Sequence, residues 1–253
     1  MTDSIRAERA GRVAVLTVDA PSSRNALTLD LSAQLAKAVE DAERDEDVHA
    51  LVITGTPPAF CAGADLSALG EAKEEGLRGI YDGFLAVAKC ALPTIAAVGG
   101  AAVGAGLNLA LAADVRLVGP HAKFVARFLE LGLHPGGGMT WMLQNAVGIQ
   151  QASAMTLFGQ VLDAEAAIRA GLALRLVSGG QDELLADALT LSRPATEAPR
   201  ELVLATKRSM RRTRALTEHP AAVDVEIAPQ LASLDSPEFV RRLASIKARI
   251  SGK

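Results

Sequence analysis

One stretch of nineteen residues, from Ile95 to Ala113, constrains the fold most strongly, because Asn108 is its only polar side chain. It begins with β-favouring residues, has glycine at positions 99, 100, 104 and 106, and ends in an Ala/Leu run before Asp114. This pattern predicts a buried strand, a tight glycine turn and a helix packed closely against neighbouring backbone. The first turn of such a helix leaves N–H groups without partners, which indicates a site for a ligand oxygen.

Three other interpretations fit parts of this stretch. A transmembrane helix would have the right length, but the glycine cluster would interrupt it in mid-span. A dinucleotide-binding turn needs the spacing G-x-G-x-x-G, which these glycines do not have. A glycine-packed core segment without any ligand stays open.

The composition is that of a soluble globular protein. The 253 residues are 49% hydrophobic, enough for one large domain or a domain with a helical extension. A net charge of -3 indicates no general attraction to nucleic acid or to an anionic membrane. The N-terminus has no secretory pattern, and two cysteines fit a reducing compartment. We therefore expect a cytoplasmic protein that binds neither nucleic acid nor membrane.

Strands and helices alternate through most of the chain, beginning with a hairpin around Gly11 and a helix that Thr28 can cap. We expect strands over residues 5–8, 13–18, 50–53, 115–118, 123–128 and 172–177, and helices over residues 28–42, 77–88, 139–147, 149–158 and 164–170. From Asp182 onward only helices are expected, so we place a boundary near residues 194–199. The prediction is an α/β core domain, residues 1–195, and a helical region, residues 196–253.

Two glycine turns follow predicted strands, one at Gly63-Ala64 and one at Ala105-Gly106. Each can point a main-chain N–H group at one oxygen atom, and together they would form an oxyanion hole. Such a hole stabilises an enolate or a tetrahedral oxyanion derived from a carbonyl group. Spacing alone does not place the two turns face to face.

Four segments resemble the enoyl-CoA hydratase/isomerase (crotonase) family in order and spacing. They are residues 21–27 with Arg24-Asn25-Ala26-Leu27, residues 60–66, residues 97–114 and residues 131–137, within a resemblance that covers roughly residues 11–177. The resemblance implies a ClpP/crotonase-type spiral of ββα units with a helical C-terminal trimerisation region. It also implies homotrimers or dimers of trimers that bind acyl-CoA thioesters. No metal or redox cofactor is implied, since coenzyme A arrives as part of the substrate.

The resemblance also assigns roles to single residues. Ala64 and Ala105 match the residues whose N–H groups hold the thioester oxygen. The candidate substrate-binding residues are Ser23, Arg24, Ala26, Ala62, Asp65, Leu66, Gly104, Gly136 and Lys207. Asp65 is also a candidate helix cap. Lys207 belongs to a basic cluster with Arg208, Arg211, Arg212 and Arg214, which fits either the phosphates of coenzyme A or a solvated face.

The chain departs from the family at the catalytic positions. Family hydratases carry glutamates where this chain has Asn108 and Phe128, and other branches carry an aspartate at the position of Gly136. Neither an amide nor a phenyl ring transfers protons near neutral pH, and each lost group is worth roughly 10²- to 10⁴-fold in rate. We therefore expect ordinary hydratase activity to be very weak.

Other side chains are candidates for substitute chemistry. His134 is a candidate base, or a loop histidine bonded to backbone. Glu130, two residues beyond Phe128, would share the face of that residue on a strand. Cys61 with His134 would form a nucleophilic dyad, or Cys61 is a small buried thiol. The functions left open are an acyl-CoA enzyme with altered chemistry, a non-catalytic acyl-CoA carrier, and a thioester hydrolase or isomerase that uses His134 or Glu130.

Overall fold

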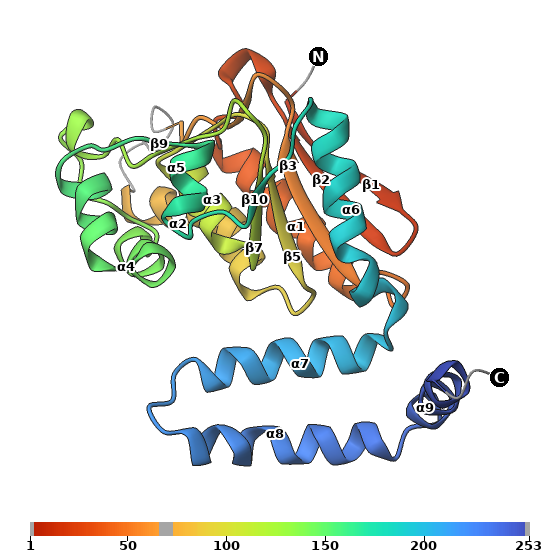
Figure 1. Cartoon of the computed structure of the whole chain (residues 1–253). Coiled ribbons are helices and arrows are strands. Elements are labelled where there is room, and N and C mark those ends of the chain that lie inside the picture. The colour runs from red at the N-terminus through yellow and green to blue at the C-terminus, as the bar shows by residue number, and fades with distance from the viewer. Residues whose placement is uncertain (1–2, 66–72, 251–253) are drawn as a thin grey trace.

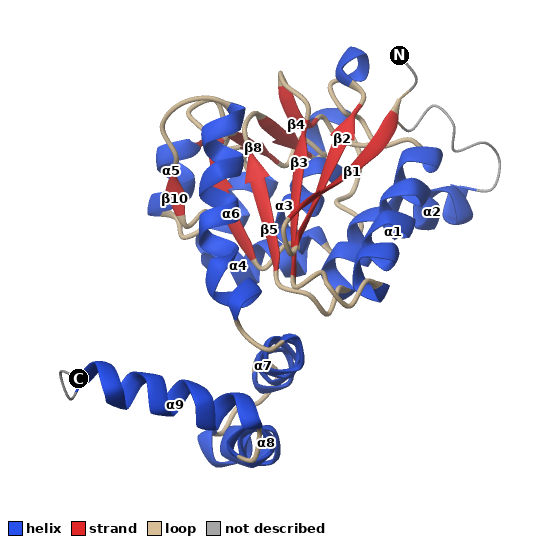
Figure 2. Cartoon of the chain, turned by 90° about the vertical axis from the view of Figure 1, so that its right-hand side faces the viewer, coloured by secondary structure: helices blue, strands red, loops and turns tan. Residues whose placement is uncertain are grey.

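The computed structural model describes residues 3–65 and 73–250, and Leu66, a candidate on the ligand path, lies outside these ranges. The described residues form a core of two sheets flanked by helices, with further helices set apart below the core (Figures 1 and 2). The lower helices come from the C-terminal end of the chain and are drawn in blue in Figure 1.

The elements follow the expected alternation. The strands are β1 (Ser4–Ala10), β2 (Val13–Asp19), β3 (Ala50–Gly55), β4 (Ala59–Cys61), β5 (Thr94–Val98), β6 (Ala101–Val103), β7 (Val115–Val118), β8 (Lys123–Val125), β9 (Leu162–Asp163) and β10 (Arg175–Leu176). The helices are α1 (Leu29–Arg44), α2 (Lys73–Lys89), α3 (Ala105–Ala112), α4 (Met139–Leu157), α5 (Ala164–Arg169), α6 (Gln181–Glu197), α7 (Arg200–Thr213), α8 (His219–Leu234) and α9 (Pro237–Ile250).

The repeated unit consists of two strands and a helix. In the units β3-β4-α2 and β5-β6-α3, the first strand joins the larger sheet and the second strand joins the smaller one. The larger sheet has the order β1-β2-β3-β5-β7-β10, and the smaller sheet has the order β4-β6-β8-β9. Because β4, β6 and β8 are parallel, their carboxyl ends lie at one edge of the smaller sheet.

The central strands of the larger sheet are buried on both faces. Every residue of β3 and β5 is buried, as expected for parallel strands covered by helices on each side. Alternate side chains such as Val52 and Ile95 pack toward Leu184 and Ala188 of α6, in a smaller apolar cluster. Their neighbours, such as Ile53, belong to the main core with Leu35 and Phe84.

Several local predictions are confirmed by this structure. The hairpin around Gly11 forms β1 and β2, with Ala10 opposite Val13. Thr28 caps α1, because its side chain accepts a hydrogen bond from the N–H of Leu31 at 3.1 Å. Gly148 adopts φ 75° and ψ 167° inside α4, so this helix is two helices joined at the predicted position.

Other predicted elements are wrong in extent. The strand expected over residues 123–128 ends at Val125, because Arg127 takes a left-handed φ of 57°. Phe128 then starts a 3₁₀ turn over Leu129–Leu131 instead of continuing the strand. The strand expected over residues 172–177 is only Arg175–Leu176, and α6 continues through Pro194 to Glu197.

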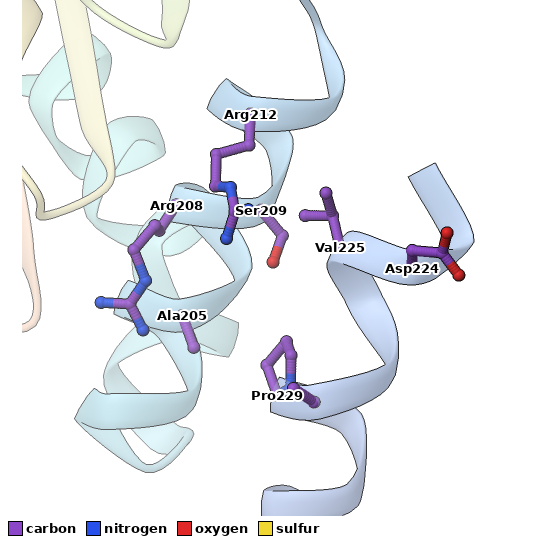
Figure 3. Close-up of a pocket in the computed structure, with 8 residues that line it drawn as sticks. Ala205, Arg208, Ser209, Arg212, Asp224, Val225 and Pro229 are labelled. Atoms are coloured by element: carbon purple, nitrogen blue, oxygen red, sulfur yellow. The ribbon is translucent and has the colours of Figure 1, made fainter. Parts of the chain in front are cut away.

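The C-terminal helices form a separate layer. A cavity of about 440 Å³ lies between α7 and α8, and its lining includes Arg208, Ser209, Arg212 and Asp224 (Figure 3). A larger groove of about 1070 Å³ separates α7 from the core, with Trp141 and Met210 in its lining. The predicted boundary near residues 194–199 and the trimerisation role of residues 196–253 stay predictions.

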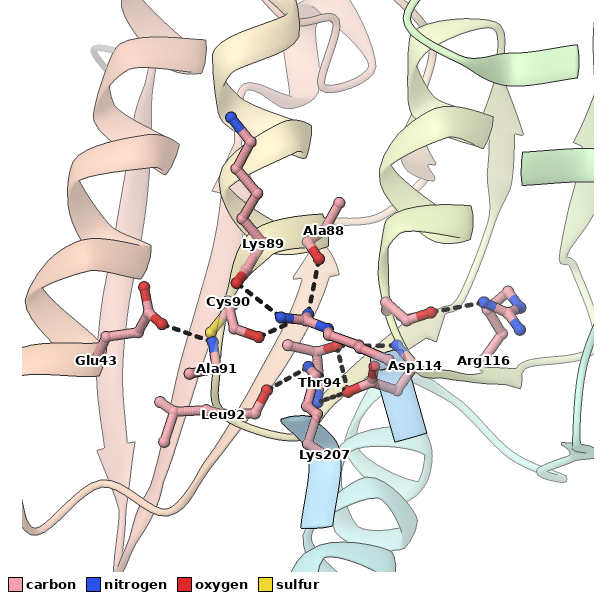
Figure 4. Close-up of polar contacts among 12 residues, drawn as sticks. Glu43, Ala88, Lys89, Cys90, Ala91, Leu92, Thr94, Asp114, Arg116 and Lys207 are labelled. Carbon is pink, nitrogen blue, oxygen red and sulfur yellow. Dashed lines mark hydrogen bonds and ion pairs between the residues drawn. The ribbon is translucent and has the colours of Figure 1, made fainter. Parts of the chain in front are cut away.

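Buried polar contacts attach α7 to the core. Lys207 Nζ donates to Asp114 Oδ2 at 2.5 Å and to the carbonyl oxygen of Leu92 at 2.6 Å (Figure 4). Arg211 donates to the carbonyl oxygens of Ala88 and Cys90 at the end of α2. The side chain of Lys207 is only 8% exposed, so its charge is balanced inside the protein and not by solvent.

The closest backbone approach in the core lies at the start of α3. A Cβ atom added to Gly106 would lie 2.0 Å from the carbonyl oxygen of Cys61, at the end of β4. Only glycine permits this contact, although alanine is the better helix former at an interior position. The contact holds the first turn of α3 against the turn that follows β4.

We expect Gly106→Ala to lower the free energy of unfolding by about 3 kcal/mol or more, because the added methyl group would overlap main chain that cannot move aside. Gly119→Ala is the matched control, since a Cβ there meets its nearest atom at 3.4 Å. We expect that control to change stability by less than about 1 kcal/mol. Urea unfolding of both variants measures the difference, and equal stabilities would contradict the close approach.

We expect Lys207→Met to destabilise the protein by about 1–3 kcal/mol, because Asp114 and the Leu92 carbonyl lose a buried donor. Asp114 keeps its hydrogen bonds to Thr94 and is 40% exposed, so the loss stays below that of a fully buried pair. Arg208→Met, at an exposed neighbour, should stay within about 0.5 kcal/mol of the wild type. Fluorescence of the single tryptophan, Trp141, follows unfolding in urea. A variant at Lys207 as stable as the Arg208 control would refute the structural role.

Candidate active site

The candidate site lies where β4 and β6 end. These strands pair in parallel, with Ala59 opposite Ala101 and Cys61 opposite Ala102, so the turns that follow them leave the same edge of the sheet. A Cβ on Gly63 would lie 3.2 Å from the carbonyl oxygen of Val103. With the contact at Gly106, this places the two predicted glycine turns side by side.

Each turn presents a main-chain N–H group. Leu27 donates to the carbonyl oxygen of Gly63 at 2.8 Å and accepts from the N–H of Asp65 at 2.8 Å. In this parallel bridge the intervening residue, Ala64, directs its own N–H away from Leu27. Ala105 is the first residue of α3, so its N–H has no acceptor within the helix. Gly104 reaches the turn with φ 52°, a conformation that favours glycine.

The segment before α1 lies against the first turn. The N–H of Ala62 donates to the carbonyl oxygen of Arg24 at 3.0 Å, which brings two of the candidate ligand-path residues together. Asn25 is fully buried and donates to the carbonyl oxygens of Thr56 and Ala59 at 2.7 and 2.8 Å. The side chain of Asn25, which sequence reasoning did not assign a role, therefore fixes this segment. A left-handed φ of 62° at an asparagine is the signal that only the structure reveals.

The other candidate substrate-binding residues near this contact are exposed or half-buried. Ser23 and Arg24 are exposed, and the Ser23 hydroxyl donates to the carbonyl oxygen of Ala20 at 3.0 Å. Ala26 and Asp65 are half-buried. These placements leave polar groups at the surface beside the main-chain donors.

Asn108 connects α3 to the glycine loop. Its side chain is 1% exposed, and Nδ2 donates to the carbonyl oxygen of Gly136 at 3.0 Å. This bond fixes the amide orientation, because the opposite orientation would bring two oxygen acceptors together. Oδ1 is buried, and no residue within 3–65 or 73–250 forms a hydrogen bond with it. Asn108 therefore supports the loop and offers one unsatisfied acceptor.

The glycine loop is pressed against two helices. A Cβ on Gly137 would lie 2.4 Å from the Phe84 ring and 2.7 Å from Asn108 Nδ2. A Cβ on Gly136 would lie 2.2 Å from the hydroxyl oxygen of Tyr81 on α2. Tyr81 lies within the helix expected over residues 77–88, and its sequence position gave it no role at the site. Its hydroxyl, the feature that distinguishes it from its helical neighbours, was the missed signal.

The two side chains predicted as substitute acid–base groups, Glu130 and His134, are both exposed. Glu130 is exposed and pairs with Arg127 at 3.4 Å, and it sits on a 3₁₀ turn, so the shared strand face with Phe128 is wrong. His134 is exposed, and its Nδ1 lies 2.7 Å from the carbonyl oxygen of Pro135. That contact fits the backbone-bonded interpretation of His134. Phe128 is half-buried and packs on the core near Gly104.

The structure favours the small buried thiol over the nucleophilic dyad of Cys61 with His134. Cys61 is fully buried, and burial raises the pKa of its thiol to about 12. A thiol that stays protonated near neutral pH is a poor nucleophile. Its Sγ lies 3.5 Å from the carbonyl oxygen of Gly63, in the turn itself. Cys61 is therefore a small buried residue under the main-chain donors.

The basic cluster divides into different environments. Lys207 and Arg211 contact core carbonyl groups, which gives them a structural role. Binding of coenzyme A phosphates by Lys207 stays a prediction. Arg214 lies over the Trp141 ring at 4.8 Å. Arg208 and Arg212 line the cavity between α7 and α8.

Residues 3–65 and 73–250 hold no group of three or more His, Cys, Asp or Glu side chains arranged to bind a metal ion. Over the same ranges, no helix combines the length and the apolar character that a membrane crossing requires.

We expect both cysteines to resist a thiol reagent in the native protein and to react after unfolding. Burial raises the pKa of Cys61 and of Cys90 to about 12, from an ordinary value of 9.0. Above pH 9 the unfolded chain loses thiol protons that the folded chain keeps. The free energy of unfolding therefore falls as the pH rises toward 12, by up to about 1.4 kcal/mol for each pH unit and each thiol.

The control is the double variant with Cys61→Ala and Cys90→Ala, which should lack this extra alkaline loss of stability. Thiol counting with an aromatic disulfide reagent, with and without urea, gives the reactivities. Rapid reaction of one thiol in the folded protein at neutral pH would restore the case for a nucleophilic Cys61.

Comparison with known proteins places this geometry in a family. The model for enoyl-CoA hydratase/isomerase matches residues 8–238. The probable enoyl-CoA hydratase EchA14 of Mycobacterium tuberculosis is 56% identical over 246 residues, 94% of each chain. The 1,2-epoxyphenylacetyl-CoA isomerase of Escherichia coli K12 is 37% identical over 183 residues, 69% of each chain.

Solved structures agree with this match. The crystal structure of a probable enoyl-CoA hydratase/isomerase from Mycobacterium abscessus has a TM-score of 0.88 and 29% sequence identity, over 97% of this chain and 96% of that chain. The two-sheet arrangement of ββα units is the crotonase fold that the sequence resemblance implied. The chain belongs to the enoyl-CoA hydratase/isomerase family.

Proposed function

We propose that this protein binds acyl-CoA thioesters and that the N–H groups of Ala64 and Ala105 hold the thioester carbonyl oxygen. The observation that carries the proposal is the meeting of two turns at the ends of β4 and β6, with Gly106 against the carbonyl of Cys61. Two main-chain donors aimed at one oxygen stabilise negative charge as it develops there. The M. tuberculosis and E. coli relatives are named for CoA thioesters, which supports the same ligand class.

The ligand path proposed for coenzyme A follows the two segments joined by the bond between Ala62 and Arg24. Ser23, Ala26 and Asp65 lie along this seam, and Gly104 leads into the second donor. Coenzyme A enters as part of the ligand, so the proposal includes no further cofactor and no metal.

The chemistry proposed differs from ordinary hydration. The buried amide of Asn108 holds Gly136 and has no proton to exchange near neutral pH, and Phe128 is a packed phenyl ring. We therefore favour an enzyme of acyl-CoA metabolism whose proton transfer is made by another group. The second candidate is a non-catalytic acyl-CoA carrier, which the structural use of Asn108 favours.

The assembly proposed is a homotrimer or a dimer of trimers in the cytoplasm. Val223, Ile227 and Leu231 follow at four-residue spacing on α8, and they are 39%, 47% and 56% exposed. An apolar stripe of this kind is typical of an interaction surface. Helix α8 lies apart from the core in Figure 1, and the exposure of these three side chains supports contact with a second copy of the chain.

One paired experiment separates the enzyme from the carrier. Calorimetric titration with acyl-CoAs of several chain lengths measures binding, and the same preparation is assayed for hydration of a short 2-enoyl-CoA. Binding without turnover supports the carrier. Hydration at rates ordinary for hydratases would contradict the consequence drawn from Asn108 and Phe128, and no binding of any CoA ester would overturn both candidates.

We expect Ala105→Pro to weaken acyl-CoA binding about 2- to 10-fold, because proline lacks the proposed donor N–H and one such hydrogen bond is worth about 0.5–1.5 kcal/mol. Proline is well tolerated at the first position of a helix, so α3 should persist. Ala164→Pro makes the same change at the first position of α5, and that variant should bind like the wild type. Circular dichroism checks the fold of both, and equal affinities would remove Ala105 from the oxyanion hole.

A further inference from the structure

Tyr81 brings a polar group to a part of the site that otherwise lacks proton chemistry. It lies on α2 and is half-buried, with its ring tilted against Phe84 at a centroid distance of 5.4 Å. Its hydroxyl oxygen lies 2.2 Å from the point where a Cβ of Gly136 would stand. Any side chain at position 136 would therefore collide with this hydroxyl.

A series of contacts connects the Tyr81 hydroxyl to the proposed oxyanion hole. Asn108 lies three residues after Ala105 on α3, about 4.5 Å of helix rise, and its Nδ2 holds the carbonyl of Gly136. The Tyr81 hydroxyl reaches the same glycine from the opposite helix. Gly136 and Asn108 therefore connect the Tyr81 hydroxyl to the first turn of α3.

Two polar atoms, the Tyr81 hydroxyl oxygen and Asn108 Oδ1, have no hydrogen-bond partner in the described part of the chain. No described residue forms a hydrogen bond with the Tyr81 hydroxyl, and Asn108 Oδ1 is buried without a partner. A purely apolar ligand would cover the hydroxyl and leave it unpaired, which costs about 1–3 kcal/mol. An oxygen substituent on the ligand would instead accept a hydrogen bond from it.

We propose that the Tyr81 hydroxyl is a specificity-determining group that hydrogen-bonds an oxygen substituent on the acyl chain, close to the thioester. The inference rests on the proposed acyl-CoA function and adds to it one residue, Tyr81, that selects among acyl chains by an oxygen substituent. Sites that pair a buried or half-buried polar group with a ligand hydroxyl discriminate against the analogue that lacks it.

The test compares two thioesters that differ in one oxygen, 3-hydroxybutyryl-CoA and butyryl-CoA, by calorimetry. We expect the wild type to bind the hydroxylated thioester about 3- to 10-fold more tightly, the range of one net hydrogen bond. Tyr81→Phe should abolish this preference, chiefly by tightening the binding of butyryl-CoA, which no longer covers an unpaired hydroxyl. The substitution keeps the ring against Phe84, so the helix packing is retained.

Thr190→Val is the matched control, because it removes a hydroxyl on α6, which covers the other side of the larger sheet (Figure 2). This variant should keep the preference of the wild type. A preference that survives in Tyr81→Phe, or a wild type that binds both thioesters equally, would overturn the inference alone. A wild type that binds neither thioester would overturn the acyl-CoA function together with the inference.

Chemical modification gives an independent readout on the unmutated protein. Tyr81 is the only tyrosine of the chain, so absorbance of nitrotyrosine after treatment with tetranitromethane reports on this residue alone. We expect saturating 3-hydroxybutyryl-CoA to slow nitration at least 5-fold, and butyryl-CoA to slow it less. Equal nitration rates with and without bound 3-hydroxybutyryl-CoA would place the hydroxyl away from the ligand and contradict the inference.

Discussion

The contact between Gly106 and the carbonyl group of Cys61 is the constraint on which the candidate site depends. It is a contact between two main chains, so no side-chain rearrangement can relieve it. It fixes the start of α3 against the end of β4, and therefore fixes Ala105 relative to Ala64. The parallel pairing of β4 with β6 supplies the second constraint, since both turns leave the same sheet edge. Main-chain donors held in this way need little reorganisation when a carbonyl oxygen arrives.

Asn108 connects the proposed absence of an acid–base group with the packing of the glycine loop. An amide can donate to the carbonyl of Gly136, whereas a carboxylate accepts only and would repel that oxygen. Gly136 and Gly137 can approach α2 and α3 because neither has a side chain. Restoring a glutamate at position 108 would therefore disturb the loop as well as add a base. The two features form one arrangement of this chain.

Much of the fold could be predicted from local patterns. Thr28 before a helical apolar repeat, the turn at Gly11 and the buried run Ala50–Gly55 each have a short-range physical cause. β6 could not be predicted, because Ala101–Val103 is too short to show periodicity between two glycines. The end of β8 depends on the left-handed conformation of Arg127, which its sequence neighbours do not require.

The candidate site likewise contains features that local sequence predicts and features that depend on contacts between distant residues. The two glycine turns could be predicted because glycine itself signals a close approach, and the resemblance supplied their partnership. The contacts of Tyr81, Asn25 and Lys207 join residues more than 25 positions apart, so no local pattern reports them. Glu130 was misplaced because its predicted face depended on a strand that ends earlier.

The electrostatics of α3 connect the site with the C-terminal layer. Unpaired carbonyl groups make the end of a helix negative, and its N-terminus is correspondingly positive. At the end of α3, Arg116 donates to the carbonyl oxygen of Ala113 at 2.8 Å, and Lys207 pairs with Asp114 just beyond. Cations therefore occupy the negative end, while the first turn directs its N–H groups toward the proposed thioester oxygen. The ion pair that attaches α7 thus sits on the same helix that presents Ala105, so the position of α7 and the geometry of the main-chain donors share one rigid support.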